Sequence, residues 1–208
     1  GIDFRALGRV FVKTVIQGDK SGGGGSTITQ QLAKLLFTDN VSSNLFDRAM
    51  QKFREWIISI QLERKYTKGE IMAMYLNKFD FLNDGDGIQA ASEVYFGKPQ
   101  NELHLEEAAM LVGMLKNPSL FNPVSQLKWK RDTTVKRREV VMSQMVRKGF
   151  LTKMEYDSLR QIPYDGSTFK TTTHNDGTAQ YFRGELAKEV QRILNKDQYR
   201  KPDGTKYN

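Results

Sequence analysis

Cysteine is absent from this sequence of 208 residues, and histidine occurs only twice, at His104 and His174. Without cysteine there is no disulfide framework, no cysteine-bearing zinc site and no thiol nucleophile. His104 and Glu107 form an isolated H-x-x-E pattern with no second histidine close to them in the sequence. Because a zinc site needs three or four such ligands, we predict no metal site here.

Long apolar runs are also missing. No segment approaches the ~18 consecutive apolar residues of a membrane-spanning helix. The first five residues, Gly1-Ile2-Asp3-Phe4-Arg5, lack the apolar core of a signal peptide. We therefore expect any membrane anchor or export signal to lie outside this sequence.

The sequence does contain enough apolar residues for a core, together with an excess of positive charge. Hydrophobic residues make up 38% and aromatic residues 11%, and 32 Lys and Arg against 24 Asp and Glu give a net charge of +8. A basic balance favours a polyanionic partner, namely nucleic acid, an anionic membrane surface or a phosphorylated substrate. Charge alone does not choose among the three.

Apolar residues recur at helical spacing along almost the whole sequence, which predicts an all-α body. Three helix starts carry a capping box, which pairs Thr27 with Gln30, Thr67 with Glu70, and Thr152 with Glu155. The expected helices cover residues 7–15, 28–36, 46–65, 67–76, 105–115, 127–148, 152–160 and 182–194. Residues 164–173 are polar and β-prone, so we place a domain boundary near residues 163–166.

The first candidate site is a glycine-rich segment, residues 22–25, that opens the helix beginning near Ile28. The free N–H groups of a helix start attract anions, and glycines let a phosphate approach closely. On this helix the polar residues share the face opposite the leucines. With Ser26 at the helix start, the predicted set is Ser26, Thr27, Gln30, Gln31 and Lys34. The alternative is a flexible linker before a capped helix.

The second candidate site is one face of the helix over residues 46–65. Arg48, Gln51, Lys52 and Glu55 occupy positions i, i+3, i+4 and i+7, so they align on one side, opposite an apolar stripe that includes Phe53. A carboxylate is thereby held beside two cations. The alternative is a solvated face whose ion pairs contribute only ~0.2–0.5 kcal/mol each.

Read together, these segments resemble the signatures of the bacterial peptidoglycan glycosyltransferases, family 51, which are the polymerase modules of class A penicillin-binding proteins. The matching runs, in order, are Gly24-Gly25-Ser26-Thr27-Ile28-Thr29-Gln30-Gln31-Leu32-Ala33-Lys34, Lys52-Phe53-Arg54-Glu55-Trp56, Gly87-Ile88-Gln89-Ala90-Ala91 with Tyr95-Phe96-Gly97-Lys98, and Glu106-Glu107-Ala108-Ala109 through Asn117-Pro118. The resemblance covers residues 1–163. It implies a lysozyme-like domain in two lobes, a head and a membrane-embedded jaw, to which residues 35–45 map.

The resemblance also implies the reaction and its residues. Family members polymerise lipid II: a sugar 4-hydroxyl attacks the anomeric carbon of the growing chain, and undecaprenyl pyrophosphate leaves. Glu55 matches the family's second glutamate, near the donor pyrophosphate, and is the candidate catalytic residue. Ser26, Thr27, Gln30, Gln31, Lys34 and Lys52 match donor-site positions. Gln51 stands where the family signature usually has arginine, so Arg48 or Arg54 would supply that cation.

Two features of the sequence depart from a complete family member. In the family, a first signature that carries the glutamate assigned as general base precedes a segment like Gly1-Ile2-Asp3, with which this sequence begins. Because the sequence as given does not include that glutamate, we expect this chain to bind substrate better than it turns it over. Residues 164–208 are similar to the linker leading into a transpeptidase domain. We therefore expect a bifunctional parent protein.

The leading hypothesis is an inverting glycosyltransferase that makes β-1,4-linked glycan strands at the outer face of the bacterial cytoplasmic membrane. Its expected partners are lipid II, the growing glycan chain, the membrane surface and the cell-wall synthesis machinery, with no nucleic acid. We expect no required cofactor, although a divalent cation such as Mg²⁺ could assist at the pyrophosphate. The alternatives are a lysozyme-like glycan hydrolase and a basic helical module that binds nucleic acid without catalysis.

Overall fold

The computed structural model describes residues 25–38, 44–170 and 180–194 of the chain. Within these ranges the chain forms eight α-helices and two short 3₁₀ turns, and the only strand-like feature is an isolated bridge between Asp80 and Asp86. The α-helices are α2 (Ile28–Phe37), α3 (Leu45–Lys65), α4 (Lys68–Lys78), α5 (Ile88–Phe96), α6 (Leu105–Met114), α7 (Lys128–Arg147), α8 (Lys153–Leu159) and α9 (Gln180–Leu194), and the 3₁₀ turns are η2 (Gln100–Glu102) and η3 (Gly166–Thr168). The all-α prediction is confirmed for these residues, and none of their helices is both long and apolar enough to cross a membrane.

Helix starts follow the capping signals of the sequence closely. Thr27, Thr67 and Thr152 each accept a hydrogen bond from the backbone N–H three residues on, and the side chain at that position accepts from the N–H of the threonine. All three predicted capping boxes are confirmed. The expected helices do not include α5, which lies between Gly87 and Gly97, and the helix expected over residues 7–15 lies outside the described residues.

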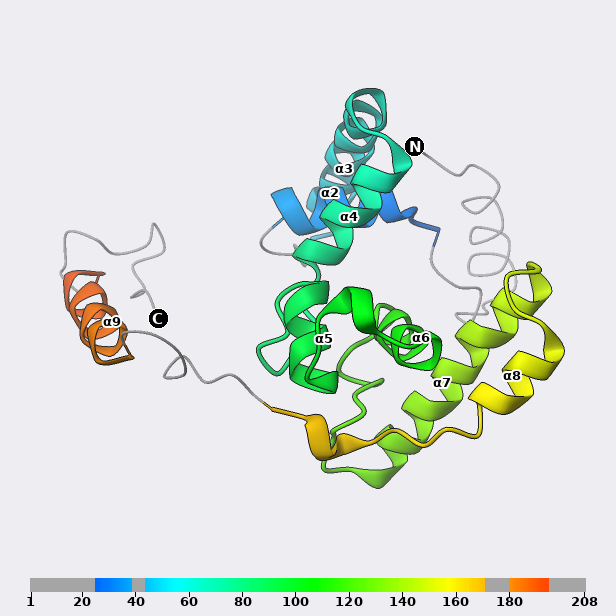
Figure 1. The fold of residues 1–208 in the computed structure, drawn as a ribbon. Coiled ribbons are helices and arrows are strands. Elements are labelled where there is room, and N and C mark those ends of the chain that lie inside the picture. The colour runs from blue at the N-terminus through cyan, green and yellow to red at the C-terminus, as the bar shows by residue number, and fades with distance from the viewer. Residues whose placement is uncertain (1–24, 39–43, 171–179, 195–208) are drawn as a thin grey trace.

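Two groups of helices build the part of the body that carries the site. Helix α2 packs against α3 and α4, while α6 packs against α7 (Figure 1). Each group has its own apolar cluster: Leu32, Ile71 and Tyr75 in the first, and a larger cluster around α5 and α6 in the second. Phe79 and Leu115 pack against both clusters and so join them.

The connection between α4 and α5 is a tight loop that folds back on itself. Leu82, Asn83 and Asp84 all have positive φ angles, of 64°, 51° and 63°. The buried Tyr95 hydroxyl donates to the carbonyl oxygen of Phe81 at 2.7 Å and accepts from the Asn83 side-chain amide at 2.8 Å. Tyr95 therefore anchors the loop to α5.

The segment after α8 contains no strand among its described residues, unlike the β-prone pattern of residues 164–173. Residues 164–170 instead contain the short turn η3, and Tyr164 and Phe169 pack against the large apolar cluster. The backbone N–H of Lys170 donates to the carbonyl oxygen of Val94 at 3.0 Å. These contacts tie the segment to α5, while the boundary near residues 163–166 stays a prediction. Helix α9 forms as predicted and is drawn apart from the other helices (Figure 1).

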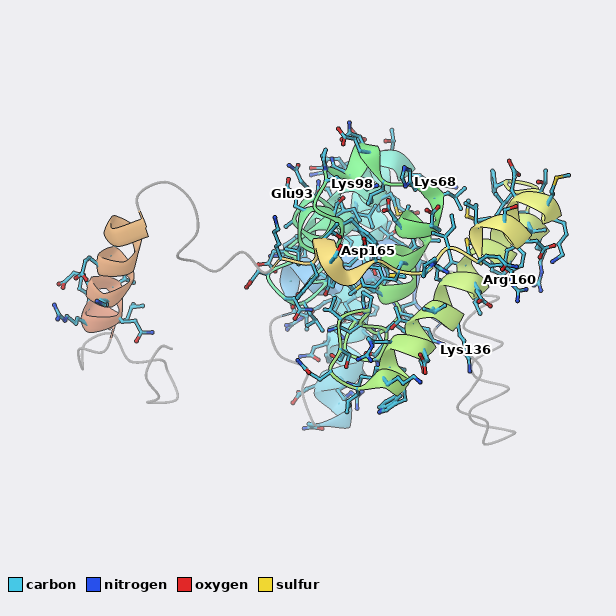
Figure 2. All side chains as sticks on the ribbon, turned by 60° about the horizontal axis from the view of Figure 1, so that its bottom comes forward. Lys68, Glu93, Lys98, Lys136, Arg160 and Asp165 are labelled. Carbon is cyan, nitrogen blue, oxygen red and sulfur yellow. The ribbon has the colours of Figure 1, made fainter. Side chains whose placement is uncertain are left out.

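Charged side chains project from several sides of the described body. Lys68 on α4, Glu93 on α5 and Lys136 on α7 are all exposed (Figure 2). Since basic and acidic residues are interspersed on this surface, charge by itself does not mark a site. Cavities and buried polar groups mark the candidate site instead.

Candidate functional site

Helices α2, α3 and α4 enclose a cavity of about 370 Å³. Its lining residues are Ser26, Gln30, Gln31, Lys34, Leu35, Lys52, Tyr75 and Phe79. The cavity therefore joins the two polar helix faces that the sequence analysis singled out separately. Lys34 and Lys52 bring two ammonium groups to it from different helices.

Helix α2 is held in place by bonds to both of its neighbours. Leu32 and Ala33 are fully buried, which turns the opposite face of α2 toward the cavity. The Tyr75 hydroxyl donates to the side-chain oxygen of Gln31 at 3.0 Å, and the Thr29 hydroxyl donates to Glu63 at 2.6 Å. These two bonds fix α2 to α4 and α3 respectively.

Gln30 carries a hydrogen-bond donor for which the described residues offer no partner. Its side-chain oxygen accepts the backbone N–H of Thr27 at 3.0 Å, which settles which end of the amide is oxygen. Gln30 is only 1% exposed, and its Nε2 has no hydrogen-bond partner among the described residues. A buried donor without a partner costs about 1–3 kcal/mol, and an anionic ligand in the cavity would remove that cost.

Glu55 is the buried carboxylate of the site. It is 4% exposed and forms a short ion pair with Lys52, one turn earlier on α3. The buried Ser59 hydroxyl donates to the backbone oxygen of Glu55 at 2.6 Å. The alternative of a solvated face is therefore wrong for Glu55, although Lys52 itself is half exposed.

The structure brings most of the predicted residues together. Ser26, Gln30, Gln31, Lys34 and Lys52 line the cavity, and Glu55 joins it through Lys52. Thr27 caps α2, and Arg48 lies one turn before Lys52 on an exposed part of α3 without lining the cavity. Three of the glycines, at positions 22–24, lie outside the described residues. The roles assigned to these side chains stay predictions.

The apolar stripe of α3 faces away from the protein. Phe46 is 71% exposed and Phe53 is 55% exposed, while Met50, Ile57 and Ile60 are all more than 40% exposed. A helix of a soluble domain usually buries its apolar face. Here the polar side of α3 is buried against α2, and the apolar side forms an exposed surface.

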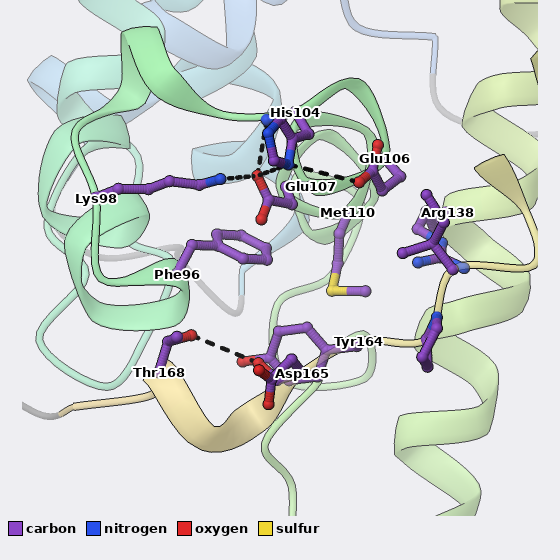
Figure 3. A pocket seen from close by; sticks show the side chains of 12 residues that line it. Phe96, Lys98, His104, Glu106, Glu107, Met110, Arg138, Tyr164, Asp165 and Thr168 are labelled. Atoms are coloured by element: carbon purple, nitrogen blue, oxygen red, sulfur yellow. Dashed lines mark hydrogen bonds and ion pairs between the residues drawn. The ribbon is translucent and has the colours of Figure 1, made fainter.

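A second cavity, which the sequence analysis did not predict, lies between α5, α6, α7 and the segment before η3 (Figure 3). It measures about 260 Å³ and contains the buried charged residues Glu106 and Arg138. His104 and Glu107, which the sequence paired as H-x-x-E, form a capping box at the start of α6. Among the described residues no group of three or more acidic, histidine or cysteine side chains could hold a metal ion.

Comparison with known proteins shows the family to which the chain belongs. The family model described as Transglycosylase matches residues 1–146, so the chain is a member of the transglycosylase family. Among curated relatives, penicillin-binding protein 1A of Pseudomonas aeruginosa is 37% identical over 167 residues, which are 80% of this chain and 19% of the relative. Penicillin-binding protein 2a of Streptococcus pneumoniae (strain R6) is 40% identical over 155 residues, covering 74% and 20% respectively.

A solved structure is among the proteins to which this chain is similar. It is the 2.6 Å crystal structure of penicillin-binding protein 1A from Haemophilus influenzae, with 27% identity, a TM-score of 0.44 and coverage of 66% of this chain and 20% of that chain. The chain thus spans about a fifth of the length of the relatives it matches.

Proposed function

We propose that this chain is the glycosyltransferase part of a class A penicillin-binding protein, which polymerises lipid II into β-1,4-linked glycan and releases undecaprenyl pyrophosphate. The observation that carries the proposal is the cavity between α2 and α3. Lys34 and Lys52 line it together with Gln30, whose buried Nε2 has no hydrogen-bond partner among the described residues. These groups suit a diphosphate, which is multiply charged and presents several acceptor oxygens.

In the proposed reaction the 4-hydroxyl of one sugar attacks the anomeric carbon of the growing chain. The bond from that carbon to the diphosphate oxygen breaks with inversion, and the hydroxyl proton passes to a general base. Lys34, Lys52 and Gln30 stabilise the negative charge that develops on the departing diphosphate. Glu55 holds the Lys52 ammonium at the cavity wall. The resemblance assigns the base to the first-signature glutamate, so Glu55 is not needed in that role.

A divalent cation could also bind at the diphosphate, but the described residues supply no set of ligands for it. The side chains that line the cavity are ammonium, amide, hydroxyl and apolar groups, and the nearby carboxylate of Glu55 is paired with Lys52. Mg²⁺ prefers carboxylate and phosphate oxygens. The described residues therefore do not form a Mg²⁺ site by themselves, and the steps above do not use the ion.

We further propose that the exposed apolar stripe of α3 lies against the membrane. Such a stripe on a helix with basic neighbours is typical of segments that bind the lipid interface. Placing it on the outer leaflet of the cytoplasmic membrane brings the cavity to lipid-linked substrate. The parent protein would there act with the cell-wall synthesis machinery and carry a transpeptidase domain.

The experiment that tests the glycosyltransferase proposal is binding of moenomycin, a phosphoglycolipid that in this family mimics the growing chain. We expect wild-type protein to bind it and Lys34→Ala and Glu55→Gln to bind at least about tenfold more weakly, since each loses or misplaces a cation at the cavity. Lys65→Ala, on the exposed end of α3, is the matched control and should bind as the wild type does. Equal binding by all four folded proteins would contradict the proposal.

The two alternatives make different predictions. A lysozyme-like hydrolase needs two carboxyl groups about 5–9.5 Å apart across a sugar-binding cleft. No carboxylate lines the α2–α3 cavity in the part of the chain that the structure describes, and Glu55 beside it is paired with Lys52. A nucleic-acid module would bind duplex DNA with an affinity that falls steeply with salt. Titrations of DNA and of lipid II in the same buffer separate that alternative from the proposal.

A further inference from the structure

The second cavity contains charges that the glycosyltransferase proposal does not use. It opens between α5, α6, α7 and residues 162–168, and both polar and apolar side chains line it (Figure 3). On one side lie Lys98, His104 and Glu107 near the mouth. On another side Phe96, Met110 and Tyr164 provide apolar and aromatic surface.

Most of the charges around this cavity already have partners. The Lys98 ammonium pairs with the Glu107 carboxylate at 2.7 Å. His104 is 71% exposed through its side chain, and its Nδ1 lies 3.6 Å from Glu107. Asp165 accepts the backbone N–H of Ser167 at 2.9 Å, which commits it to the turn at η3. These groups can shape the mouth of the cavity, but they do not need a ligand.

Two further charges are buried, one of each sign, and the Glu106 carboxylate lies 3.8 Å from Nδ1 of the exposed His104 (Figure 3). Arg138 is 2% exposed and Glu106 is 7% exposed, and both line the cavity. No ion pair joins Arg138 to a carboxylate of the described residues. Its guanidinium donates from Nη2 to the carbonyl oxygen of Arg160 at 3.2 Å, and its Nε has no hydrogen-bond partner among the described residues.

Electrostatics agree with this geometry. Burial lowers the pKa of Arg138, and the charges of Glu139 and Glu106 partly offset that effect by raising the pKa. Glu106 is therefore close enough to act on Arg138 through space but beyond ion-pair distance. A buried charge without a paired and hydrogen-bonded partner is costly, so a guest carboxylate that pairs with Arg138 supplies what the described residues leave unsatisfied there.

We propose that this cavity binds a ligand that carries a carboxylate next to an N–H donor and an apolar side chain. The carboxylate would accept hydrogen bonds from Arg138, and the N–H group would donate to Glu106. The apolar side chain would lie against Phe96, Met110 and Tyr164. The two sources of this chemistry are a free α-amino acid and the carboxyl-terminal residue of a peptide.

The size of the cavity limits the ligand to about one residue. At about 260 Å³ it falls just below the range of about 300–1,000 Å³ that holds drug-sized ligands. Charge balance favours the free amino acid, because its ammonium and carboxylate match Glu106 and Arg138 in sign. A peptide end supplies only a neutral amide N–H to Glu106. The site is separate from the α2–α3 cavity, so its test does not depend on the glycosyltransferase proposal.

The experiment titrates three small probes into protein labelled with ¹³C at the methionine methyl groups. The probes are leucine, N-acetyl-leucine, which imitates a peptide end, and leucinamide, which lacks the carboxylate. The Met110 methyl, inside the cavity, reports binding, and the Met154 methyl, which belongs to a 79% exposed side chain on α8, is the internal control. We expect leucine to shift Met110 but not Met154, with leucinamide at least about tenfold weaker.

Two variants test the assigned contacts. Arg138→Gln should weaken both carboxylate probes about tenfold or more, whereas Lys136→Gln, exposed on the same helix, should leave them unchanged. Glu106→Gln removes the charge but keeps an acceptor, so it should weaken leucine more than N-acetyl-leucine. If Arg138→Gln does not fold, Glu106→Gln alone decides this point.

The outcomes divide as follows. A Met110 shift with N-acetyl-leucine alone supports the site and assigns it to a peptide end, and a shift with leucine supports the free amino acid. Absence of any Met110 shift up to about 10 mM of each probe, where even millimolar affinity would show, overturns the proposal. Equal binding of leucinamide and leucine, or unchanged binding by the folded variants, overturns it as well.

Discussion

Replacing Gln30 by methionine separates the binding role of this side chain from its structural role. Methionine has a similar length and forms helices as readily as glutamine. In the free protein the variant loses the acceptor for the Thr27 N–H, at a cost of about 1 kcal/mol, typical of a lost helix cap. It also removes the buried, unpartnered Nε2, which relieves about 1–3 kcal/mol. Because these effects oppose each other, we expect the free energy of unfolding to stay unchanged or to rise by up to ~2 kcal/mol.

Binding of a diphosphate or phosphoglycolipid should respond much more strongly. A hydrogen bond from Gln30 to a charged oxygen is worth about 1.5–3 kcal/mol, and every 1.4 kcal/mol is a factor of ten in the dissociation constant. Gln30→Met should therefore bind moenomycin about 10- to 100-fold more weakly than the wild type. Calorimetric titration measures this change, and thermal unfolding followed by circular dichroism shows that the fold is retained.

The matched control is Gln61→Met on the same pair of helices. Gln61 is exposed on α3 and lines no part of the cavity. It should bind moenomycin with wild-type affinity. If Gln30→Met folds normally and binds within twofold of the wild type, the unpartnered amide does not meet the ligand, and the assignment of the α2–α3 cavity to an anion loses its main support.

Three further predictions concern the loop, its pH dependence and the membrane. Gly87→Ala should lower the free energy of unfolding by about 2 kcal/mol or more in urea titrations, because its φ is +85° and a Cβ there would lie 2.6 Å from a backbone oxygen of α4. Gly69→Ala, where the nearest atom to a Cβ is 4.0 Å away, should not lower it. Burial raises the pKa of Tyr95 to about 12, so the hydroxyl keeps its proton to a higher pH in the folded state than in the unfolded state. The contribution of Tyr95 to the free energy of unfolding should be complete below about pH 10 and should fall by up to ~1.4 kcal/mol per pH unit from there toward pH 12. In Tyr95→Phe the free energy of unfolding should fall less steeply over this range. The double variant Phe46→Ser, Phe53→Ser should bind anionic vesicles about 100-fold or more weakly in sedimentation assays, at unchanged thermal stability, because each phenylalanine buried in lipid contributes about 1.5–3 kcal/mol. Unchanged vesicle binding would contradict the membrane orientation.

The helices and their starts could be predicted because their signals are local. A capping box occupies four consecutive residues, and Thr27, Thr67 and Thr152 all begin helices where that pattern places them. Helix α5 was harder, because it is only nine residues long and lies between two glycines. At that length the apolar pattern distinguishes helix from strand poorly.

Residue spacing predicted the α2–α3 site only as two separate helix faces, and it was the family resemblance that assigned both faces to one donor site. Spacing placed Lys34 on one helix and Lys52 with Glu55 on another, but only the packing of α2 on α3 brings them to one cavity. The same packing buries Glu55, so the carboxylate of this charged helix face lies inside the protein. Periodicity gives the angle between the polar and apolar faces of a helix, but it does not say which of them meets the rest of the protein.

The second cavity depends on contacts across long sequence separations, which local patterns do not report. Lys98, Glu106, Arg138 and Tyr164 come from four different segments. One local signal did exist. Arg138 lies between Thr134 and Met142 at steps of four, and all three are buried on the same side of α7. A single arginine in a buried register predicts either a paired charge or a site.

The proposed orientation of α3 also sets the distance between the membrane and the Lys52–Glu55 pair. Its lipid-facing stripe and its cavity-facing residues lie on opposite sides of one helix, and a helix with its side chains is about 10–12 Å across. In the proposed orientation α3 therefore works as a spacer that holds the Lys52–Glu55 pair one helix width above the hydrocarbon. A lipid diphosphate could then react with its tail still in the membrane. Because each residue turns the helix by about 100°, inserting one residue between Phe53 and Glu55 would put the tail-binding and diphosphate-binding sides out of alignment while leaving both chemically intact.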